Sequence, residues 1–367
     1  MTTRLADIAA HAGVSEATVS RVLNGKQGVS PGTRQAVLTA LDVLGYERPA
    51  RLRQQRAGLI GLIVPELSNP IFPAFAEAIE SALARHGYMA VLCSQAPGGV
   101  AEDDYIEMLL ERGVAGIIFV NGLHANARSD RARYVRLLDQ GLPIVLVNGF
   151  RDDIDAPFVS NDDAASLEAA IGHLAAMGHR RIGLAIGQEQ YVPTRRKTEG
   201  FRRGMARYAG LTEAEAGELV VNTMYTVEGG QAAAQRLLDQ GCTAICCGND
   251  MMALGAIRAA RQRGLRVPQE VSVVGFDDSP LTAYLDPPLT TLRQSVREMS
   301  LAAVDTLLQE IGGTRAHRAE LLYRPELVVR SSTAAAPVAA PAAAAGTDAG
   351  APAVAVPAPA APADARP

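Results

Sequence analysis

The sequence predicts an α/β protein in which a small helical unit precedes a larger, two-lobed region of doubly wound parallel sheets. Residues 1–47 show apolar spacing typical of short helices. From residue 59 onward, eight short apolar runs alternate with helix-length segments, as parallel strands joined by helices do. The full length of 367 residues is enough for two or three domains. The larger region has roughly 270 residues, more than a single sheet with its covering helices usually contains, so we expect two lobes.

The front unit is expected to contain a helix-turn-helix. After a short first helix, Gly13 permits a tight turn and Ser15 is a favoured N-cap for a second helix over Glu16–Leu23. Asn24 ends that helix, and Ser30 caps a third one. In such a motif the second helix enters the major groove of double-stranded DNA.

The charge distribution agrees with a nucleic-acid-binding front end. The formal net charge of the chain is -4, but residues 1–58 hold eight Lys and Arg against four Asp and Glu, so they carry +4 and the remainder carries -8. Residues 48–58 are rich in Arg and have little to bury. We interpret them as a linker, or as a helix that needs a partner to fold.

The eight apolar runs of the larger region begin near residues 59, 88, 115, 143, 181, 218, 243 and 271. Polar or Gly-rich loops follow several of them, at 65–70, 148–151, 248–250 and 275–279. Because these loops would meet at the carboxyl ends of parallel strands, they predict a ligand-binding crevice there.

Several classes of protein are excluded. No apolar run reaches the ~18 residues of a membrane span, and the N-terminus lacks the pattern of a secretory signal. The four cysteines are expected to be reduced thiols, and no metal-ligand spacing or nucleotide-binding loop is present, so we expect neither metal nor cofactor. Residues 331–367 contain 18 Ala and seven Pro. They are expected to form a disordered tail that DNA and ligand binding do not need.

The front unit resembles the headpiece of the LacI/GalR family of bacterial transcription regulators. The family pattern A-G-V-S-x-x-T-V-S-R-V-L-N followed by V-S-x-x-T-R is matched at every position, over 12–24 and 29–34. The resemblance implies that three side chains face base edges, namely Glu16, Ala17 and Arg21. It implies that five others hold phosphates, namely Thr18, Ser20, Asn24, Ser30 and Thr33.

The linker, residues 48–58, departs from the family pattern. Relatives usually continue x-P-N-x-x-A-R-x-L after the Tyr, whereas Tyr46 is followed here by E-R-P-A-R-L-R. The resemblance assigns Leu52 as the side chain that wedges into the minor groove, and Arg51 as the arginine beside it. The alternative is a flexible basic linker that contacts only phosphates.

The resemblance continues over residues 59–330, which look like a periplasmic sugar-binding fold used for effector binding and dimerisation. Its signposts include HLAAMGHRRIGLAIG from residue 173 and VPQEVSVVGFDDSP from residue 267. The effector contacts it implies are Phe72, Asn148, Phe150, Arg196, Lys197, Asn249, Asp250 and Asp277. Lys197 stands where most relatives have Arg. From the residues alone, Asp250 is also a good helix N-cap and Asp277 a good turn former.

The resemblance implies a cytoplasmic, nucleoid-associated repressor and not an enzyme. Such a repressor binds a pseudo-palindromic operator, and a small sugar controls its affinity for that operator. Within the family, stretches such as YERPARLRQ are most similar to actinomycete regulators that respond to maltose or maltodextrin. A homodimer is implied, with a tetramer as the alternative assembly. A sugar enzyme with a regulatory headpiece and a periplasmic binding protein compete with this interpretation, but neither explains residues 1–47.

Overall fold

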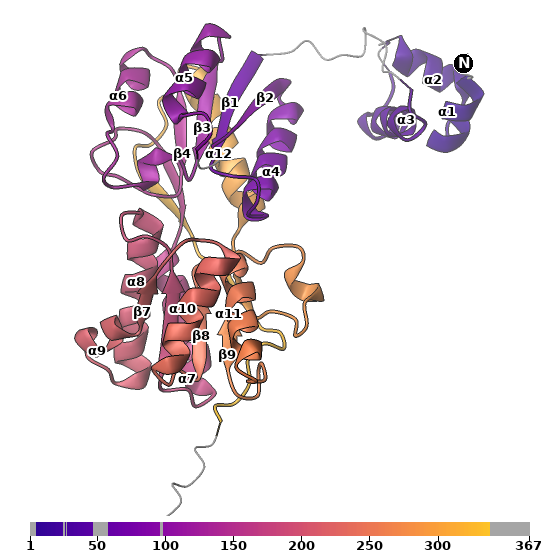
Figure 1. Ribbon diagram of the computed structural model, residues 1–367. Coiled ribbons are helices and arrows are strands. Elements are labelled where there is room, and N and C mark those ends of the chain that lie inside the picture. The colour runs from indigo at the N-terminus through magenta and orange to yellow at the C-terminus, as the bar shows by residue number, and fades with distance from the viewer. Residues whose placement is uncertain (1–4, 25, 27, 47–57, 96–97, 338–367) are drawn as a thin grey trace, which may run out of the picture. The chain divides into compact units, whose positions relative to one another are not determined.

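The computed structural model describes residues 5–24, 26, 28–46, 58–95 and 98–337 (Figure 1). The predicted linker lies outside the described residues apart from Gly58, and so does the predicted tail beyond Pro337. Within the described part of the chain, none of the helices combines the length and apolar character that a membrane span requires.

The front unit consists of three helices, α1 (Leu5–Ala12), α2 (Glu16–Leu23) and α3 (Pro31–Val43). The side chains of Ser15 and Ser30 accept hydrogen bonds from backbone amides at the starts of α2 and α3, as predicted. The small core between the helices comprises Ile8, Ala9, Val19, Val22, Val37, Ala40 and Leu41. The predicted helix-turn-helix is therefore confirmed in the limits of α2 and in both caps, whereas α1 extends two residues beyond the predicted end at residue 10.

The first lobe is built on a parallel sheet with strand order β11-β5-β4-β3-β1-β2. Its strands are β1 (Gly58–Val64), β2 (Tyr88–Ser94), β3 (Gly116–Val120), β4 (Ile144–Val147), β5 (Phe158–Asn161) and β11 (Glu320–Tyr323). Alternate strand residues pack on α4 (Ile71–Arg85) and α12 (Val296–Ile311) on one face. The other face packs on α5 (Glu102–Glu111) and α6 (Ala132–Asp139). A short helix, η2 (Leu123–Ala125), follows β3.

The second lobe has a smaller parallel sheet with strand order β7-β6-β8-β9. Its strands are β6 (Ile182–Ile186), β7 (Val220–Asn222), β8 (Ala244–Cys247) and β9 (Ser272–Val274). Its helices are α7 (Asp163–Ala176), α8 (Val192–Gly204), the π-helix η3 (Met205–Ala209), α9 (Glu213–Glu218), α10 (Val227–Asp239), α11 (Asp250–Gln262) and the short η4 (Thr282–Tyr284). One hydrophobic core holds this lobe together. It includes three of the four cysteines, and all four are buried free thiols.

The chain passes between the lobes three times. It crosses after β5, again between β10 (Thr291–Arg293) and α12, and finally between β11 and β12 (Glu326–Val328). β10 and β12 pair antiparallel with each other, so two of the crossing segments form a small ribbon. As a consequence of these crossings, α12, from the C-terminal part of the chain, lies among first-lobe elements from the first half of the chain (Figure 1).

All eight predicted strands are present, and four further strands, β5, β10, β11 and β12, were not predicted. β10, β11 and β12 are short and partly exposed, so they lack the continuous apolar runs that marked the others. The ordered chain also continues past the predicted boundary at Arg330. Ser332 is fully buried, and the backbone amide of Ala336 donates to the carbonyl of Met177 at 2.8 Å.

Candidate DNA-binding surface and effector site

One exposed face of α2 carries the side chains predicted to read base edges. Glu16, Ala17 and Arg21 are all exposed, whereas Val19 and Val22 are fully buried against the other two helices. At about 100° per residue, the three exposed positions fall on one arc opposite the buried ones. The helix therefore presents these side chains together, as insertion into a major groove requires.

Four of the hydroxyl residues form paired helix caps. Ser15 Oγ accepts from the amide of Thr18 at 3.2 Å and lies 2.9 Å from its hydroxyl. Ser30 and Thr33 repeat the arrangement at α3, with distances of 3.1 Å and 2.8 Å. The two caps fix the positions of Thr18 and Thr33 at the starts of adjacent helices, where amides and hydroxyls can both face an anion.

The remaining predicted DNA contacts lie at the end of α2 and in the linker. Asn24 Nδ2 donates to the backbone oxygen of Ser20 at 2.8 Å, so this side chain closes the helix. Arg51 and Leu52 lie outside the described residues.

A chain of polar side chains joins the two lobes at the predicted crevice. Asn148 Nδ2 donates to Asn121 Oδ1 at 2.7 Å, and Asn161 Nδ2 lies 3.3 Å from Asn148 Oδ1. Asn161 also donates to Gln294 Oε1 at 2.5 Å, and Gln294 Nε2 donates to Asp277 Oδ1 at 2.6 Å. Within the described part of the chain, the buried oxygens Asn161 Oδ1 and Asp277 Oδ2 have no close hydrogen-bond donor, although the side chain of Asn69 is near enough to Asp277 to lower its pKa. Buried acceptors without donors are rare, so these two oxygens are candidate contacts for the donor groups of a ligand.

Lys197 forms a buried ion pair. Its Nζ lies 2.5 Å from Asp163 Oδ1 and 3.9 Å from the centroid of the Phe276 ring, and both charged side chains are almost inaccessible to water. Burial and the charge of Lys197 act in opposite directions on Asp163, and burial leaves its pKa raised. The ammonium group is thus balanced by a carboxylate instead of being exposed to an anionic ligand.

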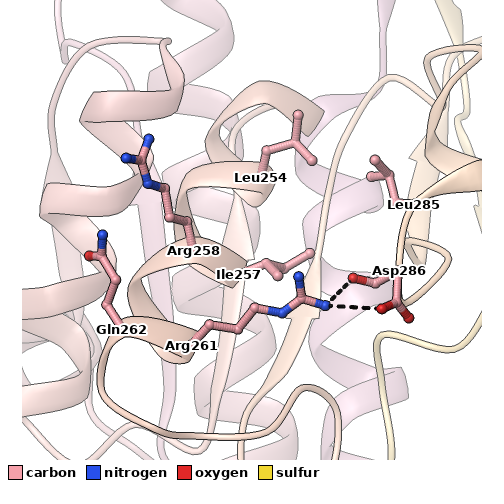
Figure 2. Close-up of a pocket in the computed structure, with 7 residues that line it drawn as sticks. All are labelled: Leu254, Ile257, Arg258, Arg261, Gln262, Leu285 and Asp286. Atoms are coloured by element: carbon pink, nitrogen blue, oxygen red, sulfur yellow. Dashed lines mark hydrogen bonds and ion pairs between the residues drawn. The ribbon is translucent and has the colours of Figure 1, made fainter.

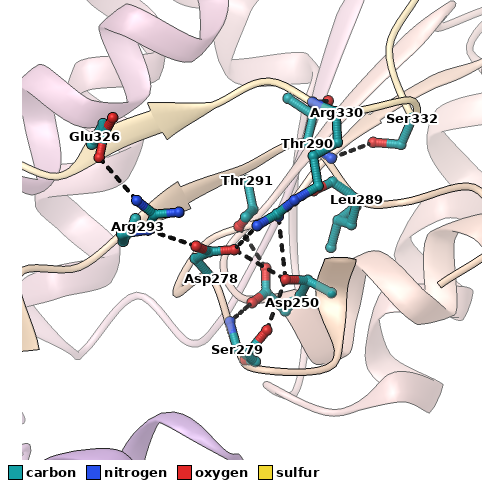
Figure 3. A network of polar contacts seen from close by, with 11 residues as sticks. Asp250, Asp278, Ser279, Leu289, Thr290, Thr291, Arg293, Glu326, Arg330 and Ser332 are labelled. Atoms are coloured by element: carbon teal, nitrogen blue, oxygen red, sulfur yellow. Dashed lines mark hydrogen bonds and ion pairs between the residues drawn. The ribbon is translucent and has the colours of Figure 1, made fainter. Parts of the chain in front are cut away.

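Asp250 does not cap α11, because Asn249 does. Asn249 Oδ1 accepts from the amide of Met252 at 2.8 Å. The carboxylate of Asp250 is buried and accepts from Thr291 Oγ1 at 2.6 Å and from the amide of Ser279 at 2.7 Å (Figure 3). Burial raises the pKa of Asp250 to about 6. The interpretation of Asp250 as a helix cap is therefore wrong.

Asp277 and Asp278 form a strained turn at the floor of the crevice. Their φ values are +117° and +57°, a region that side-chain-bearing residues seldom adopt. Asp278 is held on both sides, by Arg293 Nε at 2.7 Å and Arg330 Nη2 at 2.7 Å (Figure 3). Asp277 is buried, and burial together with the nearby Asp250 raises its pKa. Asp277 is thus a turn residue, and its role as an effector contact stays a prediction.

The two predicted aromatic residues pack on the first-lobe core, and neither lines the interlobe cavity described below. Phe72, in the first turn of α4, is half-buried against the first-lobe core. Phe150 follows β4 and packs edge-on against Phe158, with ring centroids 5.0 Å apart. One further predicted contact, Arg196, lies over Phe150 at 6.0 Å and is paired with Glu320.

Tyr225 is a candidate site residue that the sequence did not predict. Its ring lies so close to two glycines that a Cβ added at Gly187 would be 1.8 Å from Tyr225 Cε2, and one at Gly248 would be 2.8 Å from Cε1. Its hydroxyl lies 2.8 Å from Thr194 Oγ1. Burial raises the pKa of Tyr225, and the nearby charge of Lys197 opposes that shift. Asn161, Gln294 and Asp163 were also missed. The available sequence signal was the glycine that follows each of the strands β6 and β8, because a ring can lie this close to the backbone only where no side chain intervenes.

A cavity of about 300 Å³ opens between the lobes, and among the described residues Asp277 is the one predicted effector contact that lines it. Pro70 and Ile71 line it from the first lobe, Asp277 and Ser279 from the second, and Gln294 from the crossing segment. Its walls thus come from both lobes, so a ligand placed there contacts both.

A larger hollow of about 540 Å³ lies elsewhere, on the outer side of α11. Leu254, Arg258 and Arg261 line it on the helix, opposite Leu285 and Asp286, and Figure 2 shows Arg261 reaching across to Asp286. It contains none of the predicted effector residues.

Two family descriptions match the chain. Residues 4–49 match "Bacterial regulatory proteins, lacI family", and residues 171–333 match "Periplasmic binding protein-like domain". These matches cover the helix-turn-helix unit and most of the second lobe.

Individual relatives match over most of their length. The transcriptional regulator MalR of Streptomyces coelicolor is 62% identical over 338 residues, covering 92% of this chain and 98% of that protein. The repressor CytR of Escherichia coli is 32% identical over 337 residues, covering 90% and 96%. Among solved structures, a complex of the regulator CelR with cellobiose superposes with a TM-score of 0.67 at 30% identity, covering 90% of this chain and all of that one. The Lac repressor dimer bound to operator gives 0.64 at 29% identity, covering 91% and 100%.

Proposed function

Because the chain belongs to the LacI family of bacterial transcription regulators, which are not enzymes, we propose that it is a repressor controlled by a small sugar bound between its lobes. The observation that carries the proposal is the interlobe chain of polar side chains, in which two buried acceptor oxygens have no close donor among the described residues. Sugar hydroxyl groups supply such donors. We place the protein in the cytoplasm, on the nucleoid.

The DNA target is a pseudo-palindromic operator. Arg21 and Glu16 on the exposed face of α2 are suited to bond base edges, and Ala17 to contact a thymine methyl group. Phosphates are contacted by Thr18, Ser20, Asn24, Ser30 and Thr33. Arg51 and Leu52 of the linker act in the minor groove. Two copies of α2, one from each subunit, contact the two half-sites.

The effector is a neutral sugar, and we propose maltose or a maltodextrin. The pairing of Lys197 with Asp163 supports a neutral ligand, because it leaves no unbalanced positive charge to attract an anion. Tyr225 and Phe150 offer aromatic surface to the apolar face of a pyranose ring. The 30% identical CelR structure is a complex with cellobiose, which is also a disaccharide.

The active form is a homodimer, and a pair of dimers is the alternative assembly. Each lobe exposes apolar side chains that a second subunit could cover. Leu281 and Tyr284 are 67% and 85% exposed in the second lobe, and Met89 and Leu92 of the edge strand β2 are 39% and 48% exposed in the first. Because both lobes then contact the partner, a change in lobe orientation alters the spacing of the headpieces. By linkage, operator and sugar weaken each other's binding by the same factor.

Fluorescence anisotropy tests the proposal. A pseudo-palindromic fragment from the protein's own locus and a scrambled fragment are titrated at fixed salt, with and without maltose, maltotriose, cellobiose or ribose. We expect specific binding that maltose or maltotriose releases. If only cellobiose or ribose releases the DNA, that sugar and not maltose is the effector. Equal affinity for the scrambled fragment would contradict the proposal that the protein binds a specific operator.

A further inference from the structure

An ion pair ties the two lobes together at the edge of the crevice. Arg196, on α8 of the second lobe, donates from Nη1 and Nη2 to the two carboxylate oxygens of Glu320 at 2.6 Å and 2.9 Å. Glu320 begins β11, the edge strand of the first lobe. The two side chains are only 26% and 12% exposed. Among the ion pairs of the described residues, this one connects α8 directly to the first-lobe sheet.

Other contacts between the lobes flank this pair. The amide of Ala127, just after η2 in the first lobe, donates to the carbonyl of Gln190 in the second at 2.9 Å. The guanidinium of Arg196 also lies 6.0 Å from the ring of Phe150 in the first lobe. The next residue, Lys197, points inward to the buried pair with Asp163. One turn of α8 thus supplies both a buried site residue and an interlobe contact.

We propose that Arg196 is a positioning residue that does not touch the effector. Through Glu320 it fastens the lobes in the arrangement that brings Asn148 of the first lobe and Asp277 of the second to the same ligand. Both terminal nitrogens of Arg196 are engaged by the carboxylate, so the geometry favours this role over the direct effector contact that the sequence suggested. A bidentate, partly shielded pair holds a fixed geometry better than an exposed one.

Hydrogen exchange tests the fastening without any sugar. The amide of Ala127 is protected by a bond across the lobes, so its exchange rate reports how often they separate. We expect Glu320→Gln and Arg196→Gln to speed this exchange by roughly two- to fivefold, and the charge reversal R196E/E320R to restore it. Arg318→Gln is the matched control, because its pair with Glu310 lies within the first lobe and is similarly shielded, at 21% and 12% exposure. Unchanged exchange in Glu320→Gln, or no recovery in the charge reversal, would overturn the proposal.

Calorimetric titration with maltose and maltotriose separates positioning from direct contact. If Arg196 acts through Glu320, then Glu320→Gln and Arg196→Gln weaken binding by the same factor, and the charge reversal recovers it. If Arg196 touches the sugar, only Arg196→Gln weakens binding and the charge reversal does not recover it, which refutes the proposal. This arm rests on the proposed function. Should the unmodified protein bind neither sugar, the proposed effector fails, and the exchange measurement still decides whether the pair fastens the lobes.

Discussion

Truncating the chain at Arg330 should destabilise the second lobe, whereas ending it at Pro337 should not. The segment between them is bound to β9 and its surroundings. Ser332 Oγ donates to the carbonyl of Val273 at 2.6 Å and accepts from the amide of Thr290 at 2.8 Å. The carbonyl of Ser332 accepts from the amide of Val273 at 2.8 Å.

The expected cost follows from the groups left without partners. Removing residues 331–337 breaks ten hydrogen bonds among the described residues: those three, the bond from Ala336 to Met177, one from Ser331 to Pro288, two at Thr333 and three at Ala334. At about 0.5–1.5 kcal/mol each, these bonds lower the free energy of unfolding by about 5–15 kcal/mol, which is comparable with the whole stability of an ordinary domain. Ser332→Ala, which removes only the buried hydroxyl, should cost about 1–3 kcal/mol.

Urea denaturation followed by circular dichroism measures both effects. We expect the chain ending at Pro337 to unfold at the same urea concentration as the full chain, because the described hydrogen bonds of this segment end at Ala336. Ser331→Ala is the control for Ser332→Ala, since Ser331 is exposed. The reasoning is refuted if the chains ending at Arg330 and Pro337 unfold together.

Three further outcomes are expected. Arg21→Ala should lower operator affinity by about 1–3 kcal/mol and reduce discrimination against scrambled DNA in anisotropy titrations, because a base-edge contact is lost; a uniform loss on both DNAs would instead indicate a phosphate contact. Gly187→Ala should displace the ring of Tyr225 and reduce sugar affinity in calorimetry. Gly217→Ala is the control, because a Cβ added at Gly217 would lie 3.6 Å from its nearest neighbour. Equal sugar affinities of the two variants would show that the ring is not part of the site. Burial lowers the pKa of His124 from 6.5 to about 4, so as pH falls through this range the unfolded chain takes up a proton that the folded chain resists. Stability to urea should therefore drop by about 3 kcal/mol from this group, and His124→Gln should flatten that part of the pH profile; an unchanged slope would contradict it.

The helices of the headpiece and the central strands could be predicted because local signals specify them. Ser15 and Ser30 are good caps, and long apolar runs such as GLIGLIV and GIIFV mark buried parallel strands. The exposed arc of α2 followed from the same periodicity. DNA contacts by that arc stay a prediction.

The site was predicted less completely because its geometry depends on residues far apart in sequence. Arg196 and Lys197 lie in the expected crevice region, but their partners Glu320 and Asp163 carry no local signal that points to them. Gln294, which joins Asn161 to Asp277, lies in a crossing segment whose strand was itself missed. Asn249 took the capping role that single-residue preference assigned equally well to Asp250.

The three crossings between the lobes restrict how this fold can be divided. A protease that cuts one crossing segment leaves the lobes joined by the other two, so a nicked protein should migrate intact until it is denatured. For the same reason neither lobe is a continuous stretch of the gene. Exchanging one lobe with that of a relative therefore requires several junctions at once. By contrast, recombination at a single point is enough to exchange the headpiece.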